Sequence, residues 1–350
     1  MHKTIDYIIV GQGIAGSMVA HTLLSRNKNI VVIDEYNPNS SSNIAAGVVN
    51  PVTGRKMVKS WMIDEVLPFA KKTYRALENK LNANFFYEKK LIKIFSSDED
   101  EKLWRKKMIE ESYQQYLGDI IPAAQIHPSV QAPYGAGVIQ NACWLDVPTF
   151  TSATRTYLKN KNILSDEKLD FTLLQIENHI TYKNIKSNNI IFCEGYKAYL
   201  NPYFKDIPFS LAKGEHIVVQ SSMLKTDDIL TKNIFVIPKG NNMFNIGSTF
   251  IWDDKEETMT AEGRAEILQK FKKISKDDFV IIEEKAAIRP TMKDRRPVLG
   301  KHKIYNNMYI FNGLGTKGVS LAPYFSNYFA DFLETNSPIL KEVSLQRFDR

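Results

Sequence analysis

The stretch YIIVGQGIAG at residues 7–16 decides the fold of this 350-residue chain. Four apolar, strand-forming residues run directly into a turn whose three glycines are spaced GxGxxG. An apolar helical stretch follows, and then a second apolar run, residues 30–33, which ends in Asp34. The order of strand, glycine turn, helix, strand and acid predicts a dinucleotide-binding βαβ unit at the N-terminus.

Each part of this unit has a physical task. Gly11 permits the tight turn, Gly13 lets the backbone approach a pyrophosphate, and Gly16 lets the helix pack close to the strand. The free N–H groups and positive dipole end of the helix favour the phosphates. Asp34, 18 residues after Gly16, is placed to accept hydrogen bonds from ribose hydroxyls. The motif leaves open whether FAD or a nicotinamide binds, and a purely structural turn with a solvated Asp34 would share these residues.

Composition describes an ordinary globular chain, 43% hydrophobic and 24% charged. Its length suffices for two domains. No apolar run approaches the roughly 20 residues that span a bilayer, and a strand that starts so close to Met1 argues against a signal peptide. The two cysteines, Cys143 and Cys193, lack metal-ligand spacing. We therefore expect a cytoplasmic protein that holds no metal.

The net charge of +7 permits attraction to phosphates or acidic substrates. Lysines are scattered through amphipathic stretches, however, where solvated faces are the usual explanation. One basic segment, residues 50–56, is followed by Lys59 and Trp61. It suits a pyrophosphate, an acidic substrate or RNA, or simply the solvated start of a helix. A tRNA partner is therefore possible but not favoured on charge alone.

The pattern along the chain predicts an α/β protein with two domains. Helical periodicity covers residues 63–81, and a charged helix is expected over 98–116. Alternating strands are expected between 216 and 249. A strand at 308–311 then leads into a second glycine-rich turn at 313–318 and a final helix. This order implies domains that interleave along the chain.

The two glycine turns occur together with further motifs. These are Ala20 after the first turn; Ser41-Ser42 leading to Ala46-Gly47; Lys213-Gly214-Glu215; residues 237–239 followed by 246–249; Ile288-Arg289-Pro290 with Asp294 and Pro297; residues 313–323; and residues 347–350. With these motifs the chain resembles the D-amino acid oxidase-like FAD oxidoreductases, which include glycine oxidase and sarcosine oxidase. The resemblance covers most of the chain and implies FAD as the cofactor. It is specific for the superfamily and not for a substrate.

The resemblance implies a Rossmann-like FAD-binding domain interleaved with an antiparallel-sheet (α+β) substrate domain. The expected boundaries are 1–84, 146–205 and 286–350 for the first domain, and 85–145 and 206–285 for the second. In the family the C-terminal glycine turn lies at the isoalloxazine. The helix after Thr316 would point its N-terminus at the N1–C2 carbonyl edge, where its dipole stabilises the anionic reduced flavin. Lys317 would add charge there or face solvent. The residues assigned to the cofactor are Gly11, Gly13, Ile14, Ala15, Gly16, Asp34, Glu35, Ser41, Ser42, Ala46, Gly47, Gly195, Gly313, Gly315, Thr316, Lys317 and Gly318.

By the same resemblance, Arg289 pairs with a substrate carboxylate and orients the neighbouring C–H toward flavin N5. The alternative is a structural arginine that bonds strand-end carbonyls. Two positions depart from the family pattern. Phe235 stands where such amino-acid oxidases supply a tyrosine hydroxyl, and Asn245 stands where sarcosine oxidases carry a lysine. Both departures weaken the case for a simple α-amino acid as substrate and for oxygen as the best acceptor. His216 is expected to be a structural strand residue.

Three functions are compatible with these residues. The leading one is oxidation of a C–N bond of an amine or amino acid, by hydride transfer to flavin N5 and hydrolysis of the imine. The chain also resembles the flavin module that completes 5-methylaminomethyl-2-thiouridine in tRNA, so oxidation of a carboxymethylamino group on a wobble uridine is the second. A non-catalytic flavin-binding partner protein is the third. The intact Arg289 and both glycine turns argue against this last function.

Overall fold

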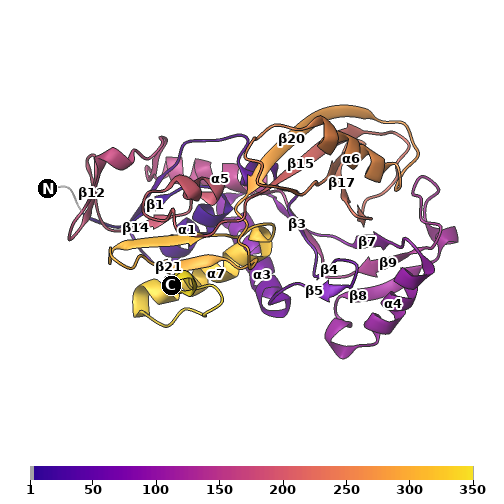
Figure 1. The fold of residues 1–350 in the computed structure, drawn as a ribbon, viewed down its shortest axis with the longest axis horizontal. Coiled ribbons are helices and arrows are strands. Elements are labelled where there is room, and N and C mark those ends of the chain that lie inside the picture. The colour runs from indigo at the N-terminus through magenta and orange to yellow at the C-terminus, as the bar shows by residue number, and fades with distance from the viewer. Residues whose placement is uncertain (1–3, 350) are drawn as a thin grey trace.

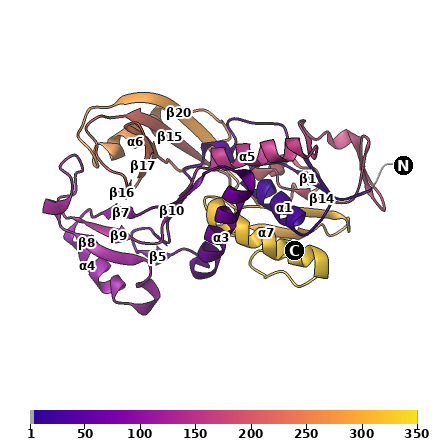
Figure 2. The ribbon, with the colours of Figure 1, turned by 180° about the vertical axis from the view of Figure 1, so that it is seen from behind.

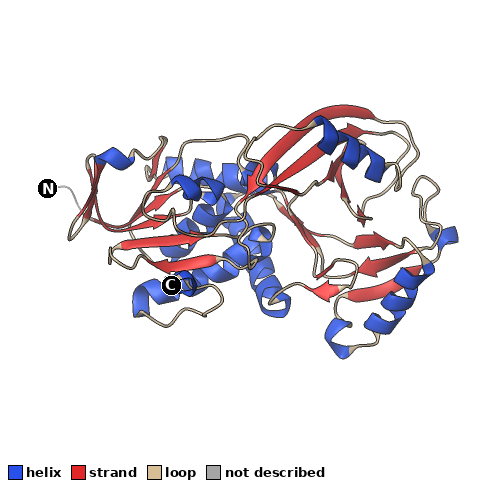
Figure 3. Ribbon diagram, viewed as in Figure 1, coloured by secondary structure: helices blue, strands red, loops and turns tan. Residues whose placement is uncertain are grey.

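The computed structural model describes residues 4–349 and shows two lobes side by side (Figure 1). One lobe is built on an eight-stranded sheet and the other on a nine-stranded sheet. Figure 2 shows the same arrangement from behind. Figure 3 shows that helices are more abundant in the lobe that holds both termini. The helices are α1 (Ile14–Ser25), α2 (Ser41–Ile44), α3 (Ile63–Leu81), α4 (Asp98–Met108), α5 (Val147–Asn160), α6 (Ala261–Phe271) and α7 (Gly318–Thr335).

The eight-stranded sheet is parallel at its centre. Its strands are β1 (Ile5–Val10), β2 (Ile30–Ile33), β11 (Leu164–Ser165), β12 (Leu174–Ile176), β13 (Ile180–Tyr182), β14 (Ile185–Phe192), β21 (Val298–Lys301) and β22 (Met308–Asn312). The parallel order is β11-β2-β1-β14-β22, with β21 antiparallel to β22 and the β12–β13 hairpin on the other half of β14. The last four residues of β1 are buried, as expected for a parallel strand covered on both faces.

The nine-stranded sheet is almost entirely antiparallel. Its strands are β7 (Leu91–Ile94), β8 (Leu117–Ile121), β9 (Ala136–Ile139), β15 (Ala212–Gln220), β16 (Ile229–Thr231), β17 (Phe235–Gly240), β18 (Met243–Gly247), β19 (Ile251–Trp252) and β20 (Val280–Arg289). The exception is the parallel pair of β7 and β16, which joins the early strands of this sheet to the late ones. The predicted α/β class, with a Rossmann-like sheet beside an antiparallel sheet, is confirmed.

Short strands lie between the two large sheets. They are β3 (Val48–Val49), β6 (Phe86–Glu88) and β10 (Cys143–Leu145) in one small sheet, and β4 (Val52–Thr53) and β5 (Val58–Lys59) in another. Among residues 4–349, no helix is both long and apolar enough to cross a bilayer.

Two local expectations were wrong. The helix predicted over 98–116 ends at Met108, and a 3₁₀ turn at Glu111–Tyr113 follows, which leaves the Tyr113 and Tyr116 side chains buried. The strand β20 was not expected at all. It was missed because three charged residues, Glu283, Glu284 and Lys285, separate two short apolar runs at 280–282 and 286–288.

Candidate active site

The first glycine turn is held by contacts that only glycine allows. Gly11 has a φ of +96°, and a Cβ there would lie 2.5 Å from the carbonyl oxygen of Cys193, at the end of β14. A Cβ on Gly16 would lie 1.8 Å from the carbonyl oxygen of Gly11. The turn therefore brings β1, α1 and β14 together more closely than any side chain permits.

The N-terminus of α1 faces a hydroxyl group. Ser42 Oγ accepts a hydrogen bond of 2.9 Å from the backbone N–H of Ile14. A Cβ on Gly13 would lie 2.8 Å from the same oxygen. The first N–H groups of a helix have no partners within the helix. The bare backbone at Gly13 thus leaves a cradle in which an oxygen can reach these donors, as a phosphate oxygen does in dinucleotide-binding folds.

Asp34 is held by a cation that lies far away in the sequence. Its Oδ1 accepts from the backbone N–H of Gln12 at 2.8 Å, and its Oδ2 accepts from Arg155 Nη1, on α5, at 2.6 Å. Arg155 also pairs with Asp166. Burial raises the pKa of Asp34 despite these bonds. The next residue, Glu35, is more exposed and pairs with Lys197 at 2.9 Å. No motif around Arg155 indicates this contact.

A cavity of about 1730 Å³ runs between the two lobes and joins these features to the second sheet. This is larger than the roughly 300–1,000 Å³ of an ordinary ligand pocket, so it has room for a dinucleotide and a substrate. Most of the residues assigned to the cofactor line it: Gly11, Gly13, Ile14, Ala15, Asp34, Glu35, Ser41, Ser42, Ala46, Gly47, Gly195, Gly315, Thr316 and Gly318.

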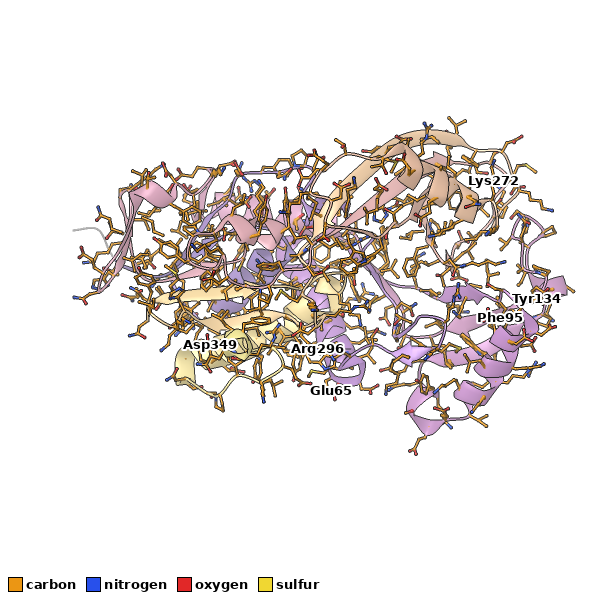
Figure 4. The ribbon with its side chains drawn as sticks, in the orientation of Figure 1. Glu65, Phe95, Tyr134, Lys272, Arg296 and Asp349 are labelled. Carbon is orange, nitrogen blue, oxygen red and sulfur yellow. The ribbon has the colours of Figure 1, made fainter. Side chains whose placement is uncertain are left out.

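Three assigned residues do not line this cavity: Gly16, Gly313 and Lys317. Gly16 faces the turn itself, and a Cβ on Gly313 would lie 2.8 Å from Cγ of Met292. Burial, with the charges of Arg296 and Arg295, lowers the pKa of Lys317. Arg296, which Figure 4 labels, stacks on the Trp61 ring at 4.3 Å. The Lys317 ammonium thus belongs to a cluster of cations outside the cavity wall.

The second glycine turn lies beside an unpartnered hydroxyl group. Gly315 has a φ of +53°, and its N–H donates to the carbonyl of Pro290 at 3.2 Å. Thr291 Oγ1 is buried and has no hydrogen-bond partner among the described residues. It lies 3.5 Å from the position of a Cβ on Gly315. Buried hydroxyls are nearly always bonded, but Thr291 is not among the residues that line the cavity.

Arg289, the last residue of β20, faces the cavity from the nine-stranded sheet. Its Nη1 donates to the carbonyl of Lys213 at 3.0 Å, and its Nη2 donates to Ser248 Oγ at 2.7 Å and to the carbonyl of Thr249 at 3.2 Å. The ring of Phe250 lies 4.6 Å from the guanidinium carbon. Among residues 4–349, no carboxylate forms an ion pair with it. Burial lowers the pKa of Arg289 to about 10.

His216 also lines the cavity, although the sequence indicated a structural role. It is 6% exposed, and burial together with the charges of Arg289 and Lys285 lowers its pKa to about 3. Phe235 and Phe250 add apolar walls to the same region. The second lobe thus presents Arg289, the neutral imidazole of His216 and two aromatic rings toward the cavity. Four further charged residues of this lobe line it: Glu257, Glu283, Glu284 and Lys285.

A family model described as FAD dependent oxidoreductase matches residues 6–332. The chain belongs to this family of FAD-dependent oxidoreductases. The match spans both glycine turns and Arg289, so the resemblance seen in the motifs is confirmed. The cofactor of this oxidoreductase is FAD.

Similar proteins match over nearly the whole oxidoreductase chain. Glycine oxidase of Bacillus subtilis (strain 168) is 22% identical over 375 residues, with 99% of this chain and 98% of that protein covered. The tRNA 5-methylaminomethyl-2-thiouridine biosynthesis bifunctional protein MnmC of Marinobacter nauticus is 22% identical, with 93% of this chain but 54% of that protein covered. The crystal structure of glycine oxidase from Bacillus cereus ATCC 14579 superposes with a TM-score of 0.81 at 19% identity, covering 96% of each chain.

The residues of the cavity fit FAD. The bare backbone at Gly13 and the N-terminus of α1 suit the pyrophosphate, and Glu35 and Asp34 suit ribose hydroxyls. Gly315, Thr316 and Gly318, which line the cavity at the start of α7, suit the flavin ring. When bound, FAD supplies a two-electron acceptor for the oxidation of a substrate.

Proposed function

We propose that this oxidoreductase oxidises a C–N bond of an amine or amino acid that carries a carboxylate. The observation that carries the proposal is Arg289. Arg289 is partly buried and has no acidic partner among residues 4–349, which is costly for a cation. It faces the cavity that both glycine turns share. A substrate carboxylate would complete the charge pair and fix the substrate on the sheet side of the cavity.

The chain's own residues position the substrate and shield it. Arg289 is held by Ser248 and by two backbone carbonyls, so its free N–H donors point in a fixed direction. Phe235 and Phe250 exclude water from the reacting carbon. A hydride, that is two electrons and one proton, would pass from the carbon of the C–N bond to bound FAD, leaving an iminium ion. Water would add to this ion and the C–N bond would break, giving a carbonyl compound and an ammonium ion. Positioning and electrostatics carry most of this chemistry.

The roles of individual cofactor residues are part of the proposal. We assign Gly11, Gly13, Ser42 and the start of α1 to the pyrophosphate, and the turn at 313–318 to the flavin ring. The segments 1–84, 146–205 and 286–350 would then form the FAD-binding domain, with 85–145 and 206–285 as the substrate domain. Cys143 and Cys193 are both free and buried, which supports a reducing, cytoplasmic location.

An anaerobic absorbance titration of the FAD-loaded protein tests the function. Glycine, sarcosine, proline, D-amino acids and N-substituted glycines are added in turn. We expect a carboxylate-bearing amine to bleach the flavin band. In Arg289→Lys, the second-order rate constant of flavin reduction should fall about 100-fold or more. Arg105→Lys, which changes an exposed arginine paired with Glu101 on α4, is the matched control.

Other outcomes assign the alternatives. Bleaching only by tRNA bearing a carboxymethylaminomethyl group would move the substrate to RNA, the alternative that the net charge of +7 and the similarity to MnmC support. Binding of that tRNA would weaken as salt rises. A yellow protein that no amine and no tRNA reduces, and that purifies with a partner, would favour the non-catalytic function and overturn the proposal.

A further inference from the structure

We propose that His216 is the second side chain, beside Arg289, that hydrogen-bonds the substrate carboxylate. The inference rests on the proposed function and adds a substrate-contacting group to it. The residue belongs to β15, the neighbour of β20, and both strands contribute to the cavity wall.

The register of the sheet brings the two side chains to the same face. The guanidinium of Arg289 lies over Gly214, where a Cβ would be 1.8 Å from Nη2. His216 follows Gly214 by two residues on β15, and such residues share a face at about 6–7 Å. The imidazole and the guanidinium therefore lie on one face of the sheet and border the same cavity.

Gly247 gives the imidazole its place. Phe235, Gly247 and His216 stand in register across three neighbouring strands, β17, β18 and β15. A Cβ on Gly247 would lie 2.8 Å from Nδ1 of His216, so the ring extends over the glycine. On its other side His216 is in register with Lys285, whose ammonium already pairs with Glu283 at 2.8 Å. Of the four residues in register, only Lys285 and His216 have polar side chains. Since Lys285 already has a partner, the His216 imidazole is the group that can bind a ligand.

His216 is 6% exposed and lines the cavity, and its imidazole forms no hydrogen bond within residues 4–349. Its ring nitrogens are not among the fully buried polar atoms, so a carboxylate in the cavity can reach them, and a hydrogen bond that involves a charged group is stronger than one between neutral groups. The low pKa keeps the ring neutral, so one nitrogen donates an N–H without placing a second positive charge beside Arg289.

Acetate binding tests the inference directly. The FAD-loaded protein is titrated with acetate, and the change in flavin absorbance gives the dissociation constant. His216→Phe keeps a ring over Gly247 but removes both nitrogens, and we expect its dissociation constant to rise about tenfold or more. His216→Gln retains a donor and should stay within about threefold of the wild type. His21→Phe changes another buried histidine, one that bonds Thr154 on α5 and does not line the cavity, and should leave acetate binding unchanged.

A second variant separates hydrogen bonding from packing. Phe235→Tyr places a hydroxyl across Gly247 from position 216, so in the His216→Phe background it should recover part of the lost acetate affinity. FAD occupancy and melting temperature are measured for every variant, because a merely structural role would change these and not acetate binding alone.

The outcomes of these experiments distinguish failure of the His216 role from failure of the proposed function. If His216→Phe folds, holds FAD and binds acetate within twofold of the wild type, the role of His216 is overturned while the proposed function stands. Should that variant not fold, the imidazole ¹⁵N signal of His216 in the wild type, assigned by its loss in His216→Gln, must shift on addition of acetate; an unshifted signal also overturns the role. A wild type that binds no acetate and is reduced by no amine would instead overturn the proposed function.

Discussion

The guanidinium of Arg289 occupies the space that a side chain at Gly214 would fill. A Cβ on Gly214 would lie 1.8 Å from Nη2 and 2.2 Å from Cζ. Neighbouring strands β15 and β20 thus cooperate, because one provides the cation and the other provides the bare backbone on which it lies. The position of the cation is therefore encoded in two residues that are far apart in the sequence.

Replacing Gly214 with alanine should displace the guanidinium. We expect Gly214→Ala to raise the dissociation constant of acetate about tenfold or more, with FAD still bound, because the carboxylate loses its aligned donors. The flavin absorbance titration measures this. Gly118→Ala is the control, since a Cβ there meets the end of the flexible Gln140 side chain at 2.6 Å. Unchanged acetate binding in Gly214→Ala would contradict the placement of Arg289.

Substitutions at Gly13 and Ser42 can distinguish a steric clash within the protein from a steric clash with the cofactor. A Cβ on Gly13 meets only Ser42, at 2.8 Å from Oγ and 3.7 Å from Cβ. Gly13→Ala should therefore lower the stability of the apoprotein, and Gly13→Ala/Ser42→Ala should restore it. Affinity for FAD should stay at least about tenfold weaker in both, because the added methyl group blocks the approach of a pyrophosphate. Denaturant unfolding and fluorescence titration with FAD give the two quantities; recovery of FAD affinity in the double variant would argue against Gly13 as the phosphate cradle.

Arg155 should contribute strongly to stability although it lies in a connecting helix. Its removal leaves the largely buried Asp34 carboxylate without its cation. We expect Arg155→Met to lower the free energy of unfolding of the apoprotein by about 3 kcal/mol. Arg105→Met, which breaks an exposed pair on α4, should cost less than about 0.5 kcal/mol. Adding Asp34→Asn to Arg155→Met should recover part of the lost free energy of unfolding. If Asp34→Asn instead lowers it as much in this background as in the wild type, the two side chains are not coupled.

Glu194 should make the stability of the apoprotein depend on pH. Burial raises the pKa of Glu194 to about 7 in the folded protein, against an ordinary value of 4.5. Between these values the folded state binds the proton more tightly than the unfolded state, so the contribution of Glu194 to stability falls as pH rises from about 4.5 to 7. Glu194→Gln removes this dependence. The free energy of unfolding of the variant, relative to that of the wild type, should increase with pH up to about pH 7 and then stay constant. If the free energies of both proteins change in parallel over this range, a raised pKa of Glu194 is excluded.

Local motifs made the fold and the cofactor predictable. The first turn could be predicted because its strand, glycines, helix and acid lie within residues 7–34, and each part needs a particular residue type. The helix at 63–81 was predicted with its observed bounds, because its apolar positions repeat with helical spacing. The oxidoreductase family and FAD followed from the two turns together.

The features of the site that could not be predicted depend on contacts between segments that are distant in the sequence. Arg155 approaches Asp34 only because α5 packs beside the first turn, and nothing near either residue signals this. A lone histidine in an apolar strand looks structural, and only the alignment of β15, β18 and β20 brings His216 to the cavity. Lys317 stood beside a glycine turn in the sequence, yet the start of α7 keeps it outside the cavity lining. The roles assigned to the individual cofactor residues stay predictions.

The parallel pair of β7 and β16 has a consequence for how the chain acquires its structure. Leu91 pairs with Ile229, so the sheet that contains the early strands β7, β8 and β9 cannot be completed until the second half of the chain has been synthesised. The other sheet likewise lacks β22 until residue 312 has been made. Since distant pairings form slowly, each nascent chain carries two unfinished sheet edges for most of its synthesis, and fragments cut before β22 should need chaperones rather than fold alone.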